Sequence, residues 1–276
     1  MNEELKKKVL KDLEKSGFHS ELAAIQTFMK AEWQCTGAAG FFDLDEQKTR
    51  ERDIDAYYGI GKDMGGGRST SVLLYHTAVE AKNTAKPWVV FKVGSMPWYK
   101  VYDSQHLVFS QSLPFQERDL NTVLSKNTIA EKENWVATSI HQSFKNPAAP
   151  SRWYSACVTA CKAAEHLLCK YEPNPDAPPY HRPFQGGSMI MFVVIRPVVV
   201  LDGILLAAEV NEGSEIIISE IEWAALNFSF ETEKYTRRNY RVDLVTLNKL
   251  SDYIQLSELR FNAIHDEMLR KIGIAS

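Results

Sequence analysis

The sequence lacks any long apolar run. Its 276 residues contain no stretch of about eighteen consecutive apolar residues, the length that a membrane-spanning helix requires. The segment from Met1 to Lys8 is charged and has no apolar core of the kind found in secretory signals. Internal repeats and low-complexity segments are absent as well. These absences predict an intracellular protein that resides in the cytoplasm and has no membrane partner.

Cysteine is also scarce, with four residues in the chain. Cys157, Cys161 and Cys169 fall in one apparent helix beside His166, which superficially suggests a metal cluster. At about 100° per residue, however, His166 and Cys169 lie far around the helix from the other two and cannot converge with them on one ion. We interpret these cysteines as small buried side chains in a reducing compartment.

An excess of positive charge is missing too, since the formal net charge is −3. A chain that binds phosphates non-specifically would be strongly basic. Local basic clusters remain at Lys6, Lys7, Lys8 and Lys11, and again between Lys234 and Arg241, but such runs are usually solvated faces. The hydrophobic fraction of 45% and the aromatic fraction of 11% are typical of a globular protein with a proper core.

The spacing of apolar residues predicts helices at both ends of the chain and strands between them. We expect helices over 2–15, from the N-cap Ser20 to about Trp33, over 116–144, over 156–171 and over 250–268. We expect strands at 37–42, 52–58, 72–82, 88–93, 189–195, 198–201, 204–206, 216–230 and 240–247, with the first three in an antiparallel meander. The glycine run 65–67 is expected to be a connector.

This order of elements predicts an α/β (α+β) fold in which one mixed sheet is interrupted by a helical insertion. We expect a single domain over 1–276, with a core formed by 16–95 and 187–276 and an insertion at about 116–172. The helical middle would shape a substrate groove or mediate oligomerisation, so a homo-oligomer is among the expected states.

Charged residues gather on two of the expected strands. Glu51, Asp53 and Asp55 share one face of the first, and Glu80 and Lys82 share one face of the second, because alternate side chains of a strand point the same way. Two carboxylates suit a hard cation such as Mg²⁺, and an ammonium group can hold or deprotonate a water on that metal. The ordinary alternative is a solvated sheet edge with a surface ion pair worth under about 1 kcal/mol.

Several short motifs accompany these charges in a fixed order. They are Ser16-Gly17-Phe18, Glu21 opening a helix, Phe42-Asp43-x-Asp45, Lys48-x-Arg50-Glu51-x-Asp53-Ile54, Val79-Glu80-Ala81-Lys82 and Lys86-Pro87-Trp88-Val89-Val90-Phe91. Together they resemble the PD-(D/E)XK, or restriction-endonuclease-like, nuclease superfamily and in particular its little-characterised bacterial members that begin with a helix. The resemblance covers about the first 95 residues.

The resemblance implies a restriction-endonuclease-like mixed β-sheet core flanked by helices, and an enzyme that hydrolyses phosphodiester bonds, with DNA favoured as its partner. It implies that Asp53, Glu80 and the backbone carbonyl of Ala81 bind Mg²⁺, for which Mn²⁺ would substitute. Lys82 would position and activate the attacking water. Glu21 would reach the metal directly or through a water.

Two features of the chain depart from the superfamily pattern. Arg52 stands where a proline often precedes the first acid, and Asp55 offers a competing ligand, so the choice between Asp53 and Asp55 stays open. The alternative function is a catalytically silent nuclease-fold module for nucleic-acid binding or complex assembly, which the acidic net charge favours. A third is an enzyme for a non-nucleic phosphodiester. The sequence does not decide between DNA and RNA, or between single and double strands.

Overall fold

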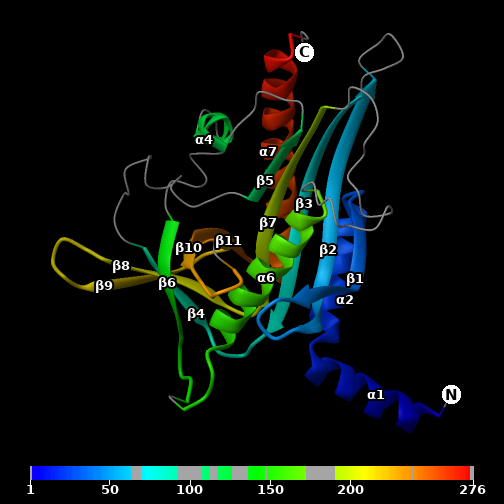
Figure 1. Ribbon diagram of the computed structural model, residues 1–276. Helices are drawn as coiled ribbons and strands as arrows, with labels where there is room; N and C mark the ends of the chain where they lie inside the picture. Colours follow the sequence, from blue (N-terminus) through cyan, green and yellow to red (C-terminus); the bar gives the residue numbers. More distant parts are fainter. Residues whose placement is uncertain are drawn as a thin grey trace.

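In the computed structural model, a large mixed β-sheet with helices on both faces forms the body of the protein (Figure 1). The structure describes residues 2–63, 70–92, 107–111, 117–125, 136–146, 148–171, 190–235, 237 and 239–273. The helices in these ranges are α1 (Glu3–Ser16), α2 (Phe18–Lys30), α4 (Glu117–Ser125), α6 (Arg152–Cys169) and α7 (Leu250–Lys271), with the 3₁₀ turn η2 (Leu247–Lys249) before α7.

The strands of the described ranges join in one sheet. They are β1 (Gln34–Asp43), β2 (Lys48–Asp63), β3 (Thr70–Asn83), β4 (Trp88–Lys92), β5 (Leu107–Gln111), β6 (Val136–Gln142), β7 (Ile190–Asp202), β8 (Leu205–Val210), β9 (Ile216–Glu220), β10 (Trp223–Ser229) and β11 (Asn239–Thr246). Their order is β1-β2-β3-β7-β11-β10-β6-β4-β8-β9, and β5 pairs with β7 outside this path.

The centre of the sheet is formed by β3 and β7. β1, β2 and β3 make the antiparallel meander that the sequence predicts, while β3, β7 and β11 run parallel to one another. β3 therefore has a strand on each side, with Val79 opposite Ile54 of β2 and Val198 of β7. A parallel centre with both faces covered favours β-branched and apolar residues, as in the buried run of β7. The predicted mixed sheet is confirmed.

Helices cover the two faces of this sheet separately (Figure 1). α6 lies on one face, where its small side chains Cys157, Ala160 and Ala164 are fully buried in one apolar cluster. α2, α4 and α7 lie on the other, where Phe28 and Phe261 belong to a second cluster. Burying a phenylalanine fully is worth about 1.5–3 kcal/mol, so these contacts anchor the helices far more firmly than helix propensity does.

Some predicted boundaries are wrong. The helix expected over 116–144 is confirmed over α4, but its last part is contradicted by β6, where Val136 and Ile140 are β-branched residues that suit a strand paired on both sides. The two strands expected at 189–195 and 198–201 are one, since β7 continues through Pro197. Ser20 does not cap α2, because Gly17 holds that position with φ 89°, and the Ser20 hydroxyl donates to Asp202 Oδ2 at 2.6 Å.

Three further findings concern position. β4, the strand expected after the meander, lies between β6 and β8. β5 occupies a stretch for which the sequence predicts no helix or strand. Of the four cysteines, Cys157 and Cys161 are buried as expected, whereas Cys169 is exposed. The glycine run 65–67 lies outside the described residues.

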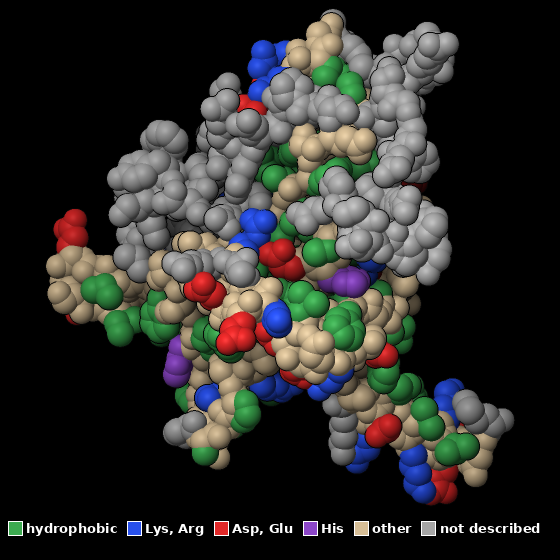
Figure 2. Space-filling model, viewed as in Figure 1, with side chains coloured by type: hydrophobic (Ala, Val, Ile, Leu, Met, Phe, Trp, Pro, Cys, Tyr) green, Lys and Arg blue, Asp and Glu red, His purple; other side chains and the backbone are tan. Residues whose placement is uncertain are grey.

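α1 extends away from the body of the protein, as Figure 2 shows at its lower right. The Asn2 side chain caps its start by accepting from the Glu4 N–H at 2.9 Å, and Gly17 ends it in a left-handed conformation. Gly17 also opens α2, so the chain turns sharply between the two helices. Within the described ranges, no helix combines the length and the apolar character needed to cross a lipid bilayer.

Candidate functional site

Asp53, Glu80 and Lys82 meet where β2 and β3 separate. The ammonium Nζ of Lys82 lies 2.8 Å from Glu80 Oε2 and 3.1 Å from Asp53 Oδ2. It also donates to the carbonyl oxygen of Ala81 at 3.1 Å. The two predicted acids, the predicted carbonyl and the predicted lysine therefore converge on one point.

The pairing of β2 with β3 explains this convergence. The ladder between the two strands reaches Ile54 and Val79, which places Asp53 next to Glu80. At this point the Asp53 carboxylate accepts a hydrogen bond from the backbone N–H of Ala81 at 2.7 Å. Asp53 thus replaces a main-chain acceptor and is held firmly against the end of β3.

Glu80 is the most deeply placed group of the site, with a side chain 5% exposed. Its Oε1 atom is buried and has no hydrogen-bond partner. Burial raises the pKa of Glu80 to about 7; the charge of Lys82 opposes this shift, and Asp53 and Glu21 add to it. A buried carboxylate with an unused oxygen beside two other acids calls for a positive partner.

Lys82 supplies part of the positive charge beside these acids. Burial by itself lowers the pKa of its ammonium group, but the charges of Glu80 and Asp53 outweigh burial and the pKa is raised. Lys82 therefore stays protonated between the two acids.

Glu21 approaches from the first turn of α2. Burial raises its pKa, and the charge of Asp53 raises it further, while Lys82 acts in the opposite direction. These interactions place Glu21 within electrostatic reach of the other acids. The described structure shows no direct contact between its side chain and Lys82, so Glu21 forms an outer wall of the site.

A pocket of about 450 Å³ opens beside this group. It is lined from the α1–α2 junction, the end of β3 with the turn after it, and the first turn of α6. The lining residues are Ser16, Gly17, Glu21, Ala81, Lys82, Asn83, Thr84, Ala85, Arg152 and Ser155. Arg152 and Ser155 were not identified from the sequence. Their spacing on one helical turn is a weak signal, and only the path of α6 brings them here.

Asp55 has different partners. Its carboxylate forms an ion pair with Arg52 and lies 2.9 Å from His76 Nε2. Burial would raise the pKa of Asp55, but the hydrogen bond and charge of His76, together with Arg52, outweigh it and lower the pKa. Asp55 therefore interacts with Arg52 and His76, and Asp53 is the aspartate that contacts Lys82 beside Glu80.

The donor atoms of the site fit a hard cation in chemistry. They are carboxylate oxygens of Asp53 and Glu80 and the Ala81 carbonyl, with the buried Glu80 Oε1 available. In the described part of the chain, no group of three His, Cys, Asp or Glu side chains is arranged so as to hold a metal ion. In this structure the Lys82 ammonium group lies between the two acids.

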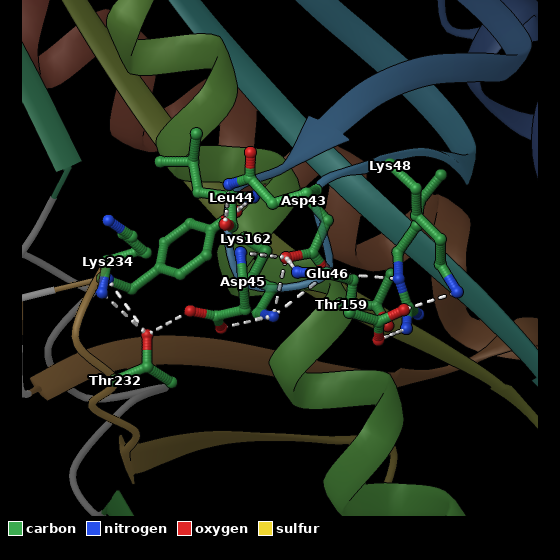
Figure 3. A network of polar contacts seen from close by, with 12 residues as sticks. Asp43, Leu44, Asp45, Glu46, Lys48, Thr159, Lys162, Thr232 and Lys234 are labelled. Atoms are coloured by element: carbon green, nitrogen blue, oxygen red, sulfur yellow. Dashed lines mark hydrogen bonds and ion pairs between the residues drawn. The ribbon is translucent and has the colours of Figure 1, made fainter.

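A second group of acids, in the turn between β1 and β2, binds a different lysine (Figure 3). Lys162 of α6 lies 2.9 Å from Asp43 Oδ1 and 2.7 Å from Asp45 Oδ2. Arg50 adds an ion pair to Asp43 at 3.1 Å, and the Thr232 hydroxyl donates to Asp45 at 2.7 Å. The Asp43 and Asp45 motif thus anchors α6 to the β1–β2 turn and contributes no group to the pocket.

Comparison with known proteins gives no relative: no family model, no curated protein and no solved structure matches the chain.

Proposed function

We propose that this protein is a nuclease that depends on Mg²⁺, with Mn²⁺ as a substitute, and that it hydrolyses phosphodiester bonds in DNA. The convergence of Asp53, Glu80, Lys82 and the Ala81 carbonyl beside an open pocket carries the proposal. It is the arrangement expected of a PD-(D/E)XK nuclease, and the mixed sheet flanked by helices is compatible with a restriction-endonuclease-like fold.

In this proposal Asp53, Glu80 and the Ala81 carbonyl would hold the metal, with Glu21 contributing through a water. When bound, the metal would polarise the phosphoryl oxygen and lower the pKa of a coordinated water. Lys82 would leave its position between the acids and donate a hydrogen bond that orients the attacking water. The buried floor formed by Glu80 would keep bulk water from the inner side of the site.

A cleavage assay tests the proposal. Plasmid, linear duplex, single-stranded DNA and RNA are incubated with the purified protein and Mg²⁺, Mn²⁺ or a chelator. We expect metal-dependent cleavage of DNA by the wild type and a loss of at least about a hundredfold in Lys82→Met, the scale of removing a group that acts in the transition state. Cleavage by Lys82→Met at the wild-type rate would contradict the proposal.

Lys92→Met is the matched control. Lys92 also lies on a strand and pairs with a carboxylate, Glu209, at 3.3 Å, but on β4 and away from the pocket. Its replacement should leave cleavage unchanged. Circular dichroism of both variants establishes that each is folded.

A nucleic-acid-binding module without hydrolysis is the second candidate function. One observation favours it: Lys82 already bridges Asp53 and Glu80, so the acids are paired without a metal. Under this alternative the wild type binds DNA in a chelator as well as in Mg²⁺ and cleaves nothing under either condition.

A further inference from the structure

The wall of the pocket opposite Lys82 and Glu21 is formed by the first turn of α6. Arg152 is the first residue of that helix, and Ser155 follows one turn later; both line the pocket. Among the described residues, the Arg152 guanidinium forms no ion pair and no side-chain hydrogen bond. The described lining of the pocket therefore combines the acid Glu21 and the lysine Lys82, which is paired with acids, with an exposed arginine that has no such partner.

The start of α6 is electrostatically unusual for this chain. Its first turn contains no acidic residue, whereas α1, α2 and α7 each have at least one there, and the Ser151 side chain does not cap it. The positive end of the helix dipole and Arg152 have the same sign, so they repel each other. An anion in the pocket would bind to both and would remove this repulsion.

The acids paired with Lys82 supply an independent reason to expect a ligand with this charge pattern. Glu80 does not itself line the pocket, but it forms an ion pair with Lys82, which does, and its second, buried oxygen lacks a hydrogen-bond partner, which favours a cation beside it. Arg152 favours an anion in the pocket. A backbone phosphate accompanied by a divalent cation supplies both charges together, whereas a neutral ligand supplies neither.

We propose that Arg152 is a substrate-binding residue that holds a phosphate of the nucleic-acid backbone in this pocket, with the N–H groups of the first turn of α6 as additional donors. This inference rests on the proposed function, because it names the wall of the site that binds substrate. The guanidinium suits the task since it donates two parallel hydrogen bonds to a phosphate.

Binding is measured apart from cleavage, by fluorescence anisotropy of labelled single-stranded and duplex DNA in Ca²⁺, with the salt concentration varied. In Arg152→Gln we expect the Kd to rise roughly tenfold or more, as for the loss of a hydrogen bond to a charged group. The slope of log K against log salt should fall by about 0.9 for duplex or about 0.7 for single strands, the value of one phosphate contact. Arg152→Lys keeps the positive charge but loses the planar guanidinium that donates two parallel hydrogen bonds, so its Kd should lie between those of the wild type and Arg152→Gln.

Arg270→Gln is the matched control, since Arg270 lies in the last turn of α7 and pairs with Glu267. It should leave the Kd and the salt slope unchanged. Thermal melts of all three variants establish that they are folded.

The outcomes separate this inference from the proposed function. If the wild type cleaves DNA and Arg152→Gln changes neither the Kd nor the salt slope, the role of Arg152 is refuted and the nuclease proposal stands. If the wild type binds but does not cleave, and Arg152→Gln weakens binding as described, Arg152 is supported and the nuclease proposal fails. If the wild type neither binds nor cleaves nucleic acid, both fail.

Discussion

The replacement Glu80→Gln should make the protein more stable near neutral pH while it removes the proposed activity. Glu80 is buried, one of its oxygens has no partner, and burial raises its pKa from the ordinary value of 4.5 to about 7. A shift of this size corresponds to about 3 kcal/mol of unfolding free energy that the ionised form costs. Glutamine keeps the shape of the side chain and cannot ionise, so the variant avoids this cost.

The pH dependence follows from the sign of the shift. Because the folded-state pKa of Glu80 lies above the unfolded one, the folded protein binds the proton more tightly, and stability falls as pH rises from about 4.5 to about 7. Urea unfolding should therefore find Glu80→Gln more stable than the wild type by up to about 3 kcal/mol near pH 8, and by much less near pH 5.

The attraction between Glu80 and Lys82 is already contained in this net shift, because it lowers the pKa of Glu80. The figure of about 3 kcal/mol is thus an upper bound on the stability gained in Glu80→Gln. A variant less stable than the wild type near pH 8, or a difference that does not change with pH, would refute the claim that Glu80 is held at a cost in stability.

Three further replacements test the framework around the site. Asp243→Asn should destabilise the protein by about 3–5 kcal/mol in urea unfolding, because Asp243 is buried and paired with Arg196 at 2.7 Å. Against the effect of burial, the charge of Arg196 lowers the pKa of Asp243. The stabilisation by Asp243 is therefore present above the unfolded-state pKa and is lost as pH falls below it. Lys162→Met leaves the two aspartates of the β1–β2 turn without their lysine and should lower the melting temperature by several degrees, for a loss of about 1–3 kcal/mol; an unchanged melt would show that the cluster does not anchor α6. In Gly203→Ala, the new Cβ would lie 2.5 Å from the Thr84 carbonyl oxygen, so the turn that lines the pocket must shift, and cleavage should fall together with stability by about 1–3 kcal/mol.

The cluster of Glu80 and Lys82 at the end of β3 could be predicted because it depends only on the alternation of side chains along one strand. Alternate residues of a strand share a face, so Glu80 and Lys82 had to lie together once 72–82 was recognised as a strand. Their meeting with Asp53 required only that the two strands pair as neighbours, which short connections favour. The metal, the substrate and the reaction remain predictions that these positions support.

The parts that could not be predicted depend on distant partners. Asp53 and Asp55 are equivalent in the local pattern, and only the positions of Arg52 and His76 separate them. Arg152 reaches the pocket because α6 crosses β3 and β7, a packing that no spacing near residue 152 indicates. The apolar spacing in the segment of β6 predicts a helix, because so short a run distinguishes strand from helix poorly, whereas its pairing with β4 and β10 makes it a strand.

Calorimetric titration with Mn²⁺ and Mg²⁺ tests the central claim, that the acids around Lys82 form a metal site, most directly. The account predicts binding to the wild type and its loss in Asp53→Asn and in Glu80→Gln. Asp252→Asn, which alters a surface acid paired with Lys249 at 3.3 Å, should bind as the wild type does. Absence of metal binding in the wild type, or binding that survives in Asp53→Asn and Glu80→Gln, would contradict the account.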